Sequence, residues 1–323
     1  MTDRTLVGTS LDAALARVGT TPADLLAHGG SVLEAGTPYL VGSLAQGLGN
    51  RGSDVDIHLF VPGLARPTPP FLFFLGQTPV DVEHYPAEEP GRLLGGLSTA
   101  AVATALGDIA LAVPPDRRPR TWLTRWCTAL PLRPDTPPVF DGAARALVTA
   151  HLLRATLSRT VLAWGTAELV AASGADAGPA WALCTRSILD LACVGAGVLP
   201  AGDKWLPARM RLAALPGDLV DAATRARTGE ATARLFGELG LPALDPLEAT
   251  RLEPDPDATE VRIGRRQHVL TQFGRLEDAP PAVAGSCRAV LGERSAGELL
   301  AAVTTGLLRL APDEDAISER LSA

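Results

Sequence analysis

The spacing of apolar residues changes along the chain, and this change constrains the fold more than any other feature. Before about residue 115 the apolar residues form short runs bounded by Gly and Pro, namely TPYLVGS (37–43), SDVDIHLFV (53–61), PFLFFLG (70–76) and TPVDVEHYP (78–86). Such runs, rich in β-branched and aromatic residues, predict neighbouring strands of one small sheet. Two earlier segments, TSLDAALARVG and TPADLLAHGG, begin with capping residues and stop at glycine. They predict two short helices.

From about residue 141 to residue 240 the apolar period becomes that of a helix. The segments GAARALVTAHLLRATLSRTVLAWGTAELVAAS, AWALCTRSILDLACVG and DLVDAATRARTGEATARLFGEL are rich in Ala and Leu and contain few internal breakers. This pattern predicts long helices packed as a bundle. The preceding segments PPDRRPR and PLRPDTPPVFDG are dense in proline, which predicts connectors.

A third region follows the stretch LPALDPLEATRLEPDPDATE. EVRIGRRQHVLTQFGRL predicts a hairpin or strand pair, and PPAVAGSCRAVLG and SAGELLAAVTTGLLRL predict helices, so that the region resembles a small winged-helix unit. We therefore expect an α+β protein with three parts. These are a mixed-sheet domain at 1–118, a helical bundle domain at 119–245 and a small C-terminal α/β, winged-helix-like module at 246–323.

Overall composition excludes several classes of function. The formal net charge of −7 and a pI near 5.3 disfavour binding to bulk nucleic acid. The N-terminal stretch has no basic segment followed by an apolar core, and no run of about 18 apolar residues occurs, which predicts a cytoplasmic protein without a membrane partner. The four cysteines lack metal-ligand spacing and predict buried free thiols.

Acidic residues on the predicted strands indicate chemistry. Asp54 and Asp56 alternate with apolar residues and so share one face of a strand, where two carboxylates repel unless a cation or proton lies between them. Gly42 and Ser43 end the preceding strand, and this pair suits close approach of a phosphate. A third acid, Asp81, lies between two valines of a later strand. Together these residues predict a site for magnesium and a nucleotide.

The order of these motifs resembles the nucleotidyltransferase superfamily of the DNA polymerase β type, particularly its aminoglycoside and lincosamide nucleotidyltransferases. The resemblance covers about residues 37 to 86. It implies that Gly42 and Ser43 hold the β- and γ-phosphates of an NTP and that Asp54 and Asp56 bind two Mg²⁺ ions. Asp81 would bind the catalytic ion and help to deprotonate the acceptor.

We therefore expect an enzyme that binds an NTP, such as ATP, together with Mg²⁺. It would transfer the nucleoside monophosphate to a hydroxyl of a small-molecule acceptor and release pyrophosphate. Glu83 shares the face of Asp81 and is a second candidate for a metal-supporting residue or general base. Alternate register places His58 on the face of the aspartates and His84 on the other face, and we expect both rings to be packed or at the solvent edge.

Two basic features lie outside the strands. Lys204, the single lysine, is expected either to reach the triphosphate or to mark a solvated helix start beside a packed Trp205. The C-terminal residues Arg262, Arg265, Arg266 and Arg275 form a stretch without acids. This stretch is a solvated strand face or a contact for a tRNA, a phosphorylated substrate or a peptide.

Two further readings of the whole chain stay open. The same fold can nucleotidylate a protein or a tRNA instead of a small molecule, and a non-catalytic protein can use it as a nucleotide-binding or peptide-binding adaptor. The net charge argues against RNA, and the retained acids argue against a non-catalytic role.

Overall fold

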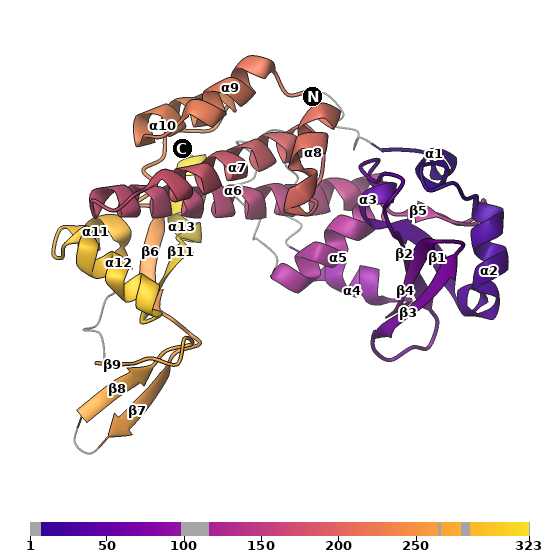
Figure 1. The fold of residues 1–323 in the computed structure, drawn as a ribbon, viewed down its shortest axis with the longest axis horizontal. Coiled ribbons are helices and arrows are strands. Elements are labelled where there is room, and N and C mark those ends of the chain that lie inside the picture. The colour runs from indigo at the N-terminus through magenta and orange to yellow at the C-terminus, as the bar shows by residue number, and fades with distance from the viewer. Residues whose placement is uncertain (1–7, 98–115, 264–265, 279–284, 323) are drawn as a thin grey trace. The chain divides into compact units, whose positions relative to one another are not determined.

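The structure is a computed structural model that describes residues 8–97, 116–263, 266–278 and 285–322. It confirms an α+β protein (Figure 1). The chain divides into two compact units, each described here by itself. Of the described residues, the first unit holds 8–97, 116–153 and 193–215, and the second holds 154–192 and the residues from 216 onward. This grouping differs from the three parts expected from the sequence, and that division stays a prediction.

A five-stranded sheet forms the centre of the first unit. Its strands are β1 (Thr37–Val41), β2 (Val55–Val61), β3 (Thr68–Leu75), β4 (Thr78–Pro86) and β5 (Leu130–Pro131), in the order β3-β4-β2-β1-β5. Strands β2 and β4 run parallel, and the other neighbours are antiparallel. The four predicted runs are thus confirmed as neighbouring strands of one sheet.

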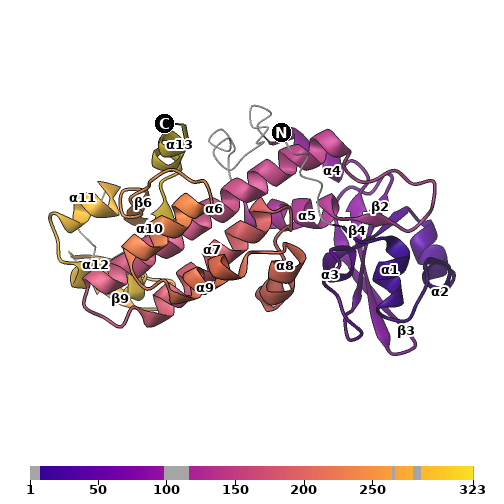
Figure 2. The same cartoon turned by 90° about the horizontal axis from the view of Figure 1, so that it is seen from above.

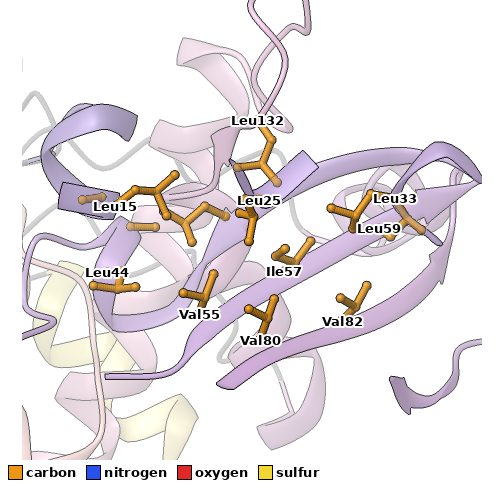
Figure 3. Packing of buried hydrophobic residues seen from close by; sticks show 13 residues of the cluster. Leu15, Leu25, Leu33, Leu44, Val55, Ile57, Leu59, Val80, Val82 and Leu132 are labelled. Carbon is orange, nitrogen blue, oxygen red and sulfur yellow. The ribbon is translucent and has the colours of Figure 1, made fainter. Parts of the chain in front are cut away.

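One face of this sheet packs against α1 (Leu11–Ala16) and α2 (Pro22–Glu34). Figure 3 shows the apolar side chains between them, which come from both helices and from β2 and β4. The core members on this face include Leu15, Leu25, Leu33, Val55, Ile57, Leu59, Val80 and Val82. The predicted stop of the second helix at glycine is confirmed, because Gly30, with a φ of 45°, is not helical and breaks α2 into two segments, the second of which runs to Glu34.

The opposite face packs against α4 (Glu89–Gly95), α5 (Arg117–Cys127) and the first part of α6 (Gly142–Ala172). Figure 2 shows the strands lying between α5 and α2. The prediction of a connector at PPDRRPR is wrong for its last four residues, which open α5. Pro119 lies in the first turn, where a helix needs no backbone N–H donor, so proline is tolerated there.

The remaining helices lie in residues 42–45 and 178–238, and in one segment two helices replace the one that the sequence pattern predicts. They are α3 (Gly42–Ala45), α7 (Gly178–Gly195), a 3₁₀ turn (Asp203–Trp205), α8 (Leu206–Leu212), α9 (Gly217–Arg225) and α10 (Gly229–Glu238). The single long helix expected over 218–239 is two helices. Ala226 turns extended, and the Thr228 side chain accepts a hydrogen bond from the backbone N–H of Ala231 and so begins α10.

The C-terminal region contains more strands than the pair expected. One three-stranded sheet has the order β10-β6-β11, from β6 (Thr250–Pro254), β10 (Gly285–Ser286) and β11 (Leu308–Pro312). Another has the order β7-β8-β9, from β7 (Thr259–Ile263), β8 (Arg266–Leu270) and β9 (Leu276–Asp278). The strand pairing expected over 260–276 is therefore confirmed.

The helices of this region are α11 (Cys287–Leu291), α12 (Ala296–Thr305) and α13 (Glu314–Ser322). The helix expected over 280–292 is confirmed from Cys287 to Leu291, but Gly285–Ser286 form β10 instead, and residues 280–284 lie outside the described residues. The helix expected over 295–310 ends at Thr305 because Gly306 adopts the left-handed conformation, and the chain then pairs with β6 as β11.

All four cysteines are free and buried, as predicted. None of the helices in the described parts of the chain has the length and apolar character needed to cross a membrane.

Candidate functional site

The parallel pairing of β2 with β4 brings the predicted acids together. Asp56 lies opposite Asp81, and His58 lies opposite Glu83. The alternating residues of both strands turn their apolar side chains to the core of Figure 3, so these four polar side chains share the other face. The predicted sharing of one face by Asp56 and His58 is therefore confirmed, and His84 faces the other way.

Gly42 lies directly beneath the carboxylate of Asp56. Val41 pairs with Asp56 across β1 and β2, and Gly42 follows with a φ of 73°, a conformation that favours glycine. A Cβ atom at this position would overlap Oδ2 of Asp56. The glycine thus lets the end of β1 approach the acid closely. The turn that follows is tight, since the carbonyl oxygen of Ser43 accepts hydrogen bonds of 2.9 Å from the N–H groups of Leu48 and Gly49.

Asp56 and Asp81 carry unbalanced charge. Burial first, and then the charges of Asp54, Asp81 and Glu83, raise the pKa of Asp56 to about 6 against the opposing effect of Arg125. Burial and then the charge of Glu83 raise the pKa of Asp81. Oδ1 of Asp81 is buried and has no hydrogen-bond partner among the described residues. A buried acceptor without a donor is costly, so this end of the strand pair favours a cation or a donor from a ligand.

Glu83, two residues further along the same face, has partners for both carboxylate oxygens. Oε1 accepts a hydrogen bond of 3.2 Å from Nη1 of Arg125, and Oε2 accepts one of 2.5 Å from the hydroxyl of Tyr85. The neighbouring His58, whose Nε2 lies 3.8 Å from Oε1, has the largest effect on the pKa of this group. With help from Tyr85 and Arg125, it outweighs burial and lowers the pKa of Glu83 to about 2. Glu83 is therefore held as a carboxylate by the protein itself.

His58 is fully buried and neutral. Nε1 of Trp126 donates a hydrogen bond of 2.8 Å to Nδ1 of His58, and an indole N–H can only donate. Nε2 of the same ring lies 3.2 Å from Nη1 of Arg125 and 3.8 Å from Oε1 of Glu83. Burial lowers the pKa of His58, in agreement with this arrangement. The expectation of a packed ring is confirmed.

Arg125 is the residue that sequence reasoning missed. Its guanidinium pairs with Glu83, and its charge also acts on Asp56 and Asp81. It comes from α5, where Trp122 and Trp126 stack on each other at a helical spacing of four residues. That aromatic spacing is the signal that could have revealed a packed helix here, but the adjoining prolines favoured a connector.

The segment that carries Lys204 packs beside the Gly42 turn in the same unit. Leu199 belongs to the apolar cluster that contains Val41, and the side-chain amide of Gln46 donates a hydrogen bond of 3.3 Å to the carbonyl of Pro200. Lys204 itself is exposed, and its Nζ lies 5.2 Å from the centre of the Trp205 ring. Trp205 is half-buried rather than packed in a core.

The predicted group of three metal-binding acids and the predicted C-terminal basic stretch are not assembled into sites among the described residues. Within the described ranges, no group of three or more His, Cys, Asp or Glu side chains is arranged to hold a metal ion. Asp54 precedes β2 and is exposed, although its charge acts on both Asp56 and Asp81. In the C-terminal basic stretch Arg262 and Arg275 are exposed, whereas Arg265 and the side chain of Arg266 lie outside the described residues.

No protein-family model matches this chain, and no curated protein matches it either.

Proposed function

We propose that this protein transfers a nucleoside monophosphate from an NTP to a hydroxyl of a small-molecule acceptor and releases pyrophosphate. One observation carries the proposal. Asp56 and Asp81 lie side by side on parallel strands, with the backbone of Gly42 against the first carboxylate and an unpartnered buried oxygen on the second. This is an anionic site that Arg125 compensates only in part, next to a turn that suits a phosphate.

The residues present fit Mg²⁺ by their chemistry. Both carboxylates supply hard oxygen ligands, and a divalent cation would relieve their mutual repulsion and occupy the unpartnered oxygen of Asp81. Magnesium sites that act on phosphates commonly use one or two carboxylates together with the substrate's own phosphates, so a preformed group of three protein ligands is not required. Asp54 would add a ligand beside Asp56. When bound, the ions neutralise charge that develops on the phosphates and on departing pyrophosphate.

The surrounding residues then have distinct tasks. The Gly42 turn, with Ser43, positions the β- and γ-phosphates, and Lys204 approaches them from the neighbouring segment. Asp81 accepts the proton of the attacking hydroxyl. Glu83 is a poor base because its pKa is about 2 and both its oxygens are engaged. Glu83 instead fixes Arg125, whose charge keeps the acids together before the substrate arrives.

The proposal also covers the division of the chain into three parts. We interpret the five-stranded sheet as a nucleotidyltransferase domain, the long helices as a helical domain and the C-terminal sheets and helices as a winged-helix-like module. Such a module can contact a peptide or a tRNA, but this rests on analogy of fold alone.

The experiment is a transfer assay with four NTPs, each labelled at the α-phosphate. The purified protein is incubated with Mg²⁺ and a mixture of small hydroxyl compounds, and labelled products are separated from NTP. We expect label to move from at least one NTP and to stay in place when Asp81→Asn is used as a matched blank. Transfer that is equally fast in Asp81→Asn would contradict the proposal.

A further inference from the structure

Strand β3 places exposed apolar side chains beside Asp81. Leu72 pairs directly with Asp81 across the antiparallel β3 and β4 strands, and Phe74 pairs with Pro79. Directly opposed residues point to the same face with Cβ atoms about 5 Å apart, so Leu72 and Phe74 share the face of the acids. Both are largely uncovered, with 55% of Leu72 and 59% of Phe74 exposed.

This exposure has no explanation within the sheet. The core-facing neighbour Phe73 packs with the apolar cluster of the opposite face, whereas neither Leu72 nor Phe74 belongs to a core cluster among the described residues. Pairing of β3 with another strand is also disfavoured, because Pro69 and Pro70 lack the N–H groups that a new ladder would need. An uncovered apolar surface next to polar chemistry is typical of a ligand site.

The lack of charged side chains around β3 indicates which class of ligand this surface favours. Residues 67–80, which span β3, its turn and the start of β4, contain no charged side chain. Strand β3 itself therefore offers hydrophobic contact and no charge, and the carboxylate that borders it is that of Asp81. A polycationic acceptor laid along β3 would find no ionic partner on this strand.

We propose that Leu72 and Phe74 form the wall of the acceptor site and select a compound with an apolar, aromatic body whose hydroxyl reaches Asp81. This inference rests on the proposed function and adds the class of acceptor to it. An aromatic ring laid on Leu72 and Phe74 buries apolar surface on both sides of the contact, and the neighbouring Asp81 fixes the position of the hydroxyl.

The test measures binding of 7-hydroxycoumarin and of 1-naphthol by fluorescence titration, without NTP or Mg²⁺. We expect saturable binding to the wild-type protein and an increase in Kd of about tenfold in Leu72→Gln and in Phe74→Gln, the size expected for loss of one well-packed apolar contact. Phe71→Gln is the matched control, because Phe71 is 45% exposed on the same strand but faces the other way. Its Kd should equal that of the wild type.

Three results would overturn the inference. They are absence of saturable binding of both compounds to the wild-type protein, an equal loss in all three variants, and displacement of the bound ring compound by a polycationic amino sugar. Sedimentation velocity adds a fourth, since a wild-type dimer that becomes a monomer in Phe74→Gln would make this surface a self-association interface. The outcome is separable from the proposed function. Failure of ring binding with label transfer intact rejects only the aromatic acceptor, and failure of transfer with ring binding intact rejects only the chemistry.

Discussion

Two neighbouring rows of the same strand pair differ in how their charges are balanced. In the row of Asp56 and Asp81, burial and the charges of neighbouring acids raise both pKa values, and one oxygen of Asp81 has no described partner. In the row of His58 and Glu83, two residues along, a tryptophan, a tyrosine and an arginine satisfy the side chains, and the pKa of Glu83 falls to about 2. The rows share a face, a sheet and a register.

We call the cross-strand pair Asp56–Asp81 the binding row and the pair His58–Glu83 the supporting row. A folded protein gains nothing by keeping acids close together and unpaired unless a ligand is to balance them. The supporting row achieves the opposite result with side chains from α5, because Arg125 and Trp126 approach only Glu83 and His58 by hydrogen bonds. We therefore infer that Asp56 and Asp81 carry the proposed chemistry and that Glu83 supports them.

The largest effect should appear when the two rows are neutralised in turn. We expect Asp56→Asn and Asp81→Asn each to lower the rate of transfer by at least about 100-fold, because each removes a metal-binding charge worth several kcal/mol in the transition state. Glu83→Gln should lower the rate of transfer by less than about tenfold, because the charge of Arg125 still acts on Asp56 and Asp81. Steady-state rates with the NTP found active would measure this. The reverse ranking would move the third acid to Glu83.

Lys204 tests whether the segment beside the Gly42 turn completes the binding row. Lys204→Ala should raise the KM for NTP and lower kcat, with a loss of about ten- to 100-fold in kcat/KM for a charge-assisted hydrogen bond. Lys204→Arg should recover part of it, because a planar guanidinium places its donors differently. Unchanged NTP kinetics with a lower Tm would instead make Lys204 part of a solvated helix start.

The free energy of unfolding should depend on pH with opposite sign for Asp56 and for Glu83. We expect this effect to be smaller than the effects on transfer. The pKa of Asp56 rises from 3.8 to about 6 on folding, so the folded chain keeps a proton that the unfolded chain releases between about pH 4 and 6. Stability thus falls as pH rises through this window, by up to about 3 kcal/mol. The pKa of Glu83 drops from 4.5 to about 2, so its contribution is complete above about pH 4.5 and is lost as pH falls toward 2.

Urea unfolding at pH 7 and pH 4 measures both contributions in metal-free buffer. At pH 7, Asp56→Asn should be more stable than the wild type by about 1 to 3 kcal/mol and Glu83→Gln less stable by a similar amount. At pH 4 the difference for Asp56→Asn should largely disappear, whereas most of the difference for Glu83→Gln should remain, because the folded-state pKa of Glu83 is about 2. Glu88→Gln, an exposed acid after β4, is the control and should change little. A destabilised Asp56→Asn at pH 7 would mean that the binding row is balanced by the protein after all.

Much of the sheet could be predicted from the sequence, because strand period and breakers are local signals. The alternation around Asp56 placed it on the face away from the core. The pairing of Asp56 with Asp81 could not be predicted, since the chain first crosses to the edge strand β3 and then turns back into β4, which lies between β3 and β2. Asp81 and Glu83 also look equivalent in the sequence, where both fall on one face of one strand.

What distinguishes those two acids comes from a helix that is distant in the chain. Arg125 reaches Glu83 across 42 residues, and the prolines before it had favoured a connector. The break between α9 and α10 was missed for a related reason, since the competition between helix continuation and the Thr228 cap is weak and is decided by packing. Local pattern thus finds the acids, and long-range packing decides their charge.

The central claim is that the binding row, and not the supporting row, receives a divalent cation together with the nucleotide. Titration with Mn²⁺ in the presence of a non-hydrolysable NTP analogue, followed by electron paramagnetic resonance of free Mn²⁺, tests it on the wild type, Asp81→Asn and Glu83→Gln. We expect Mn²⁺ to bind the wild type and Glu83→Gln with similar Kd and Asp81→Asn to lose at least about tenfold in affinity. Equal binding to Asp81→Asn and the wild type, or loss confined to Glu83→Gln, would contradict it.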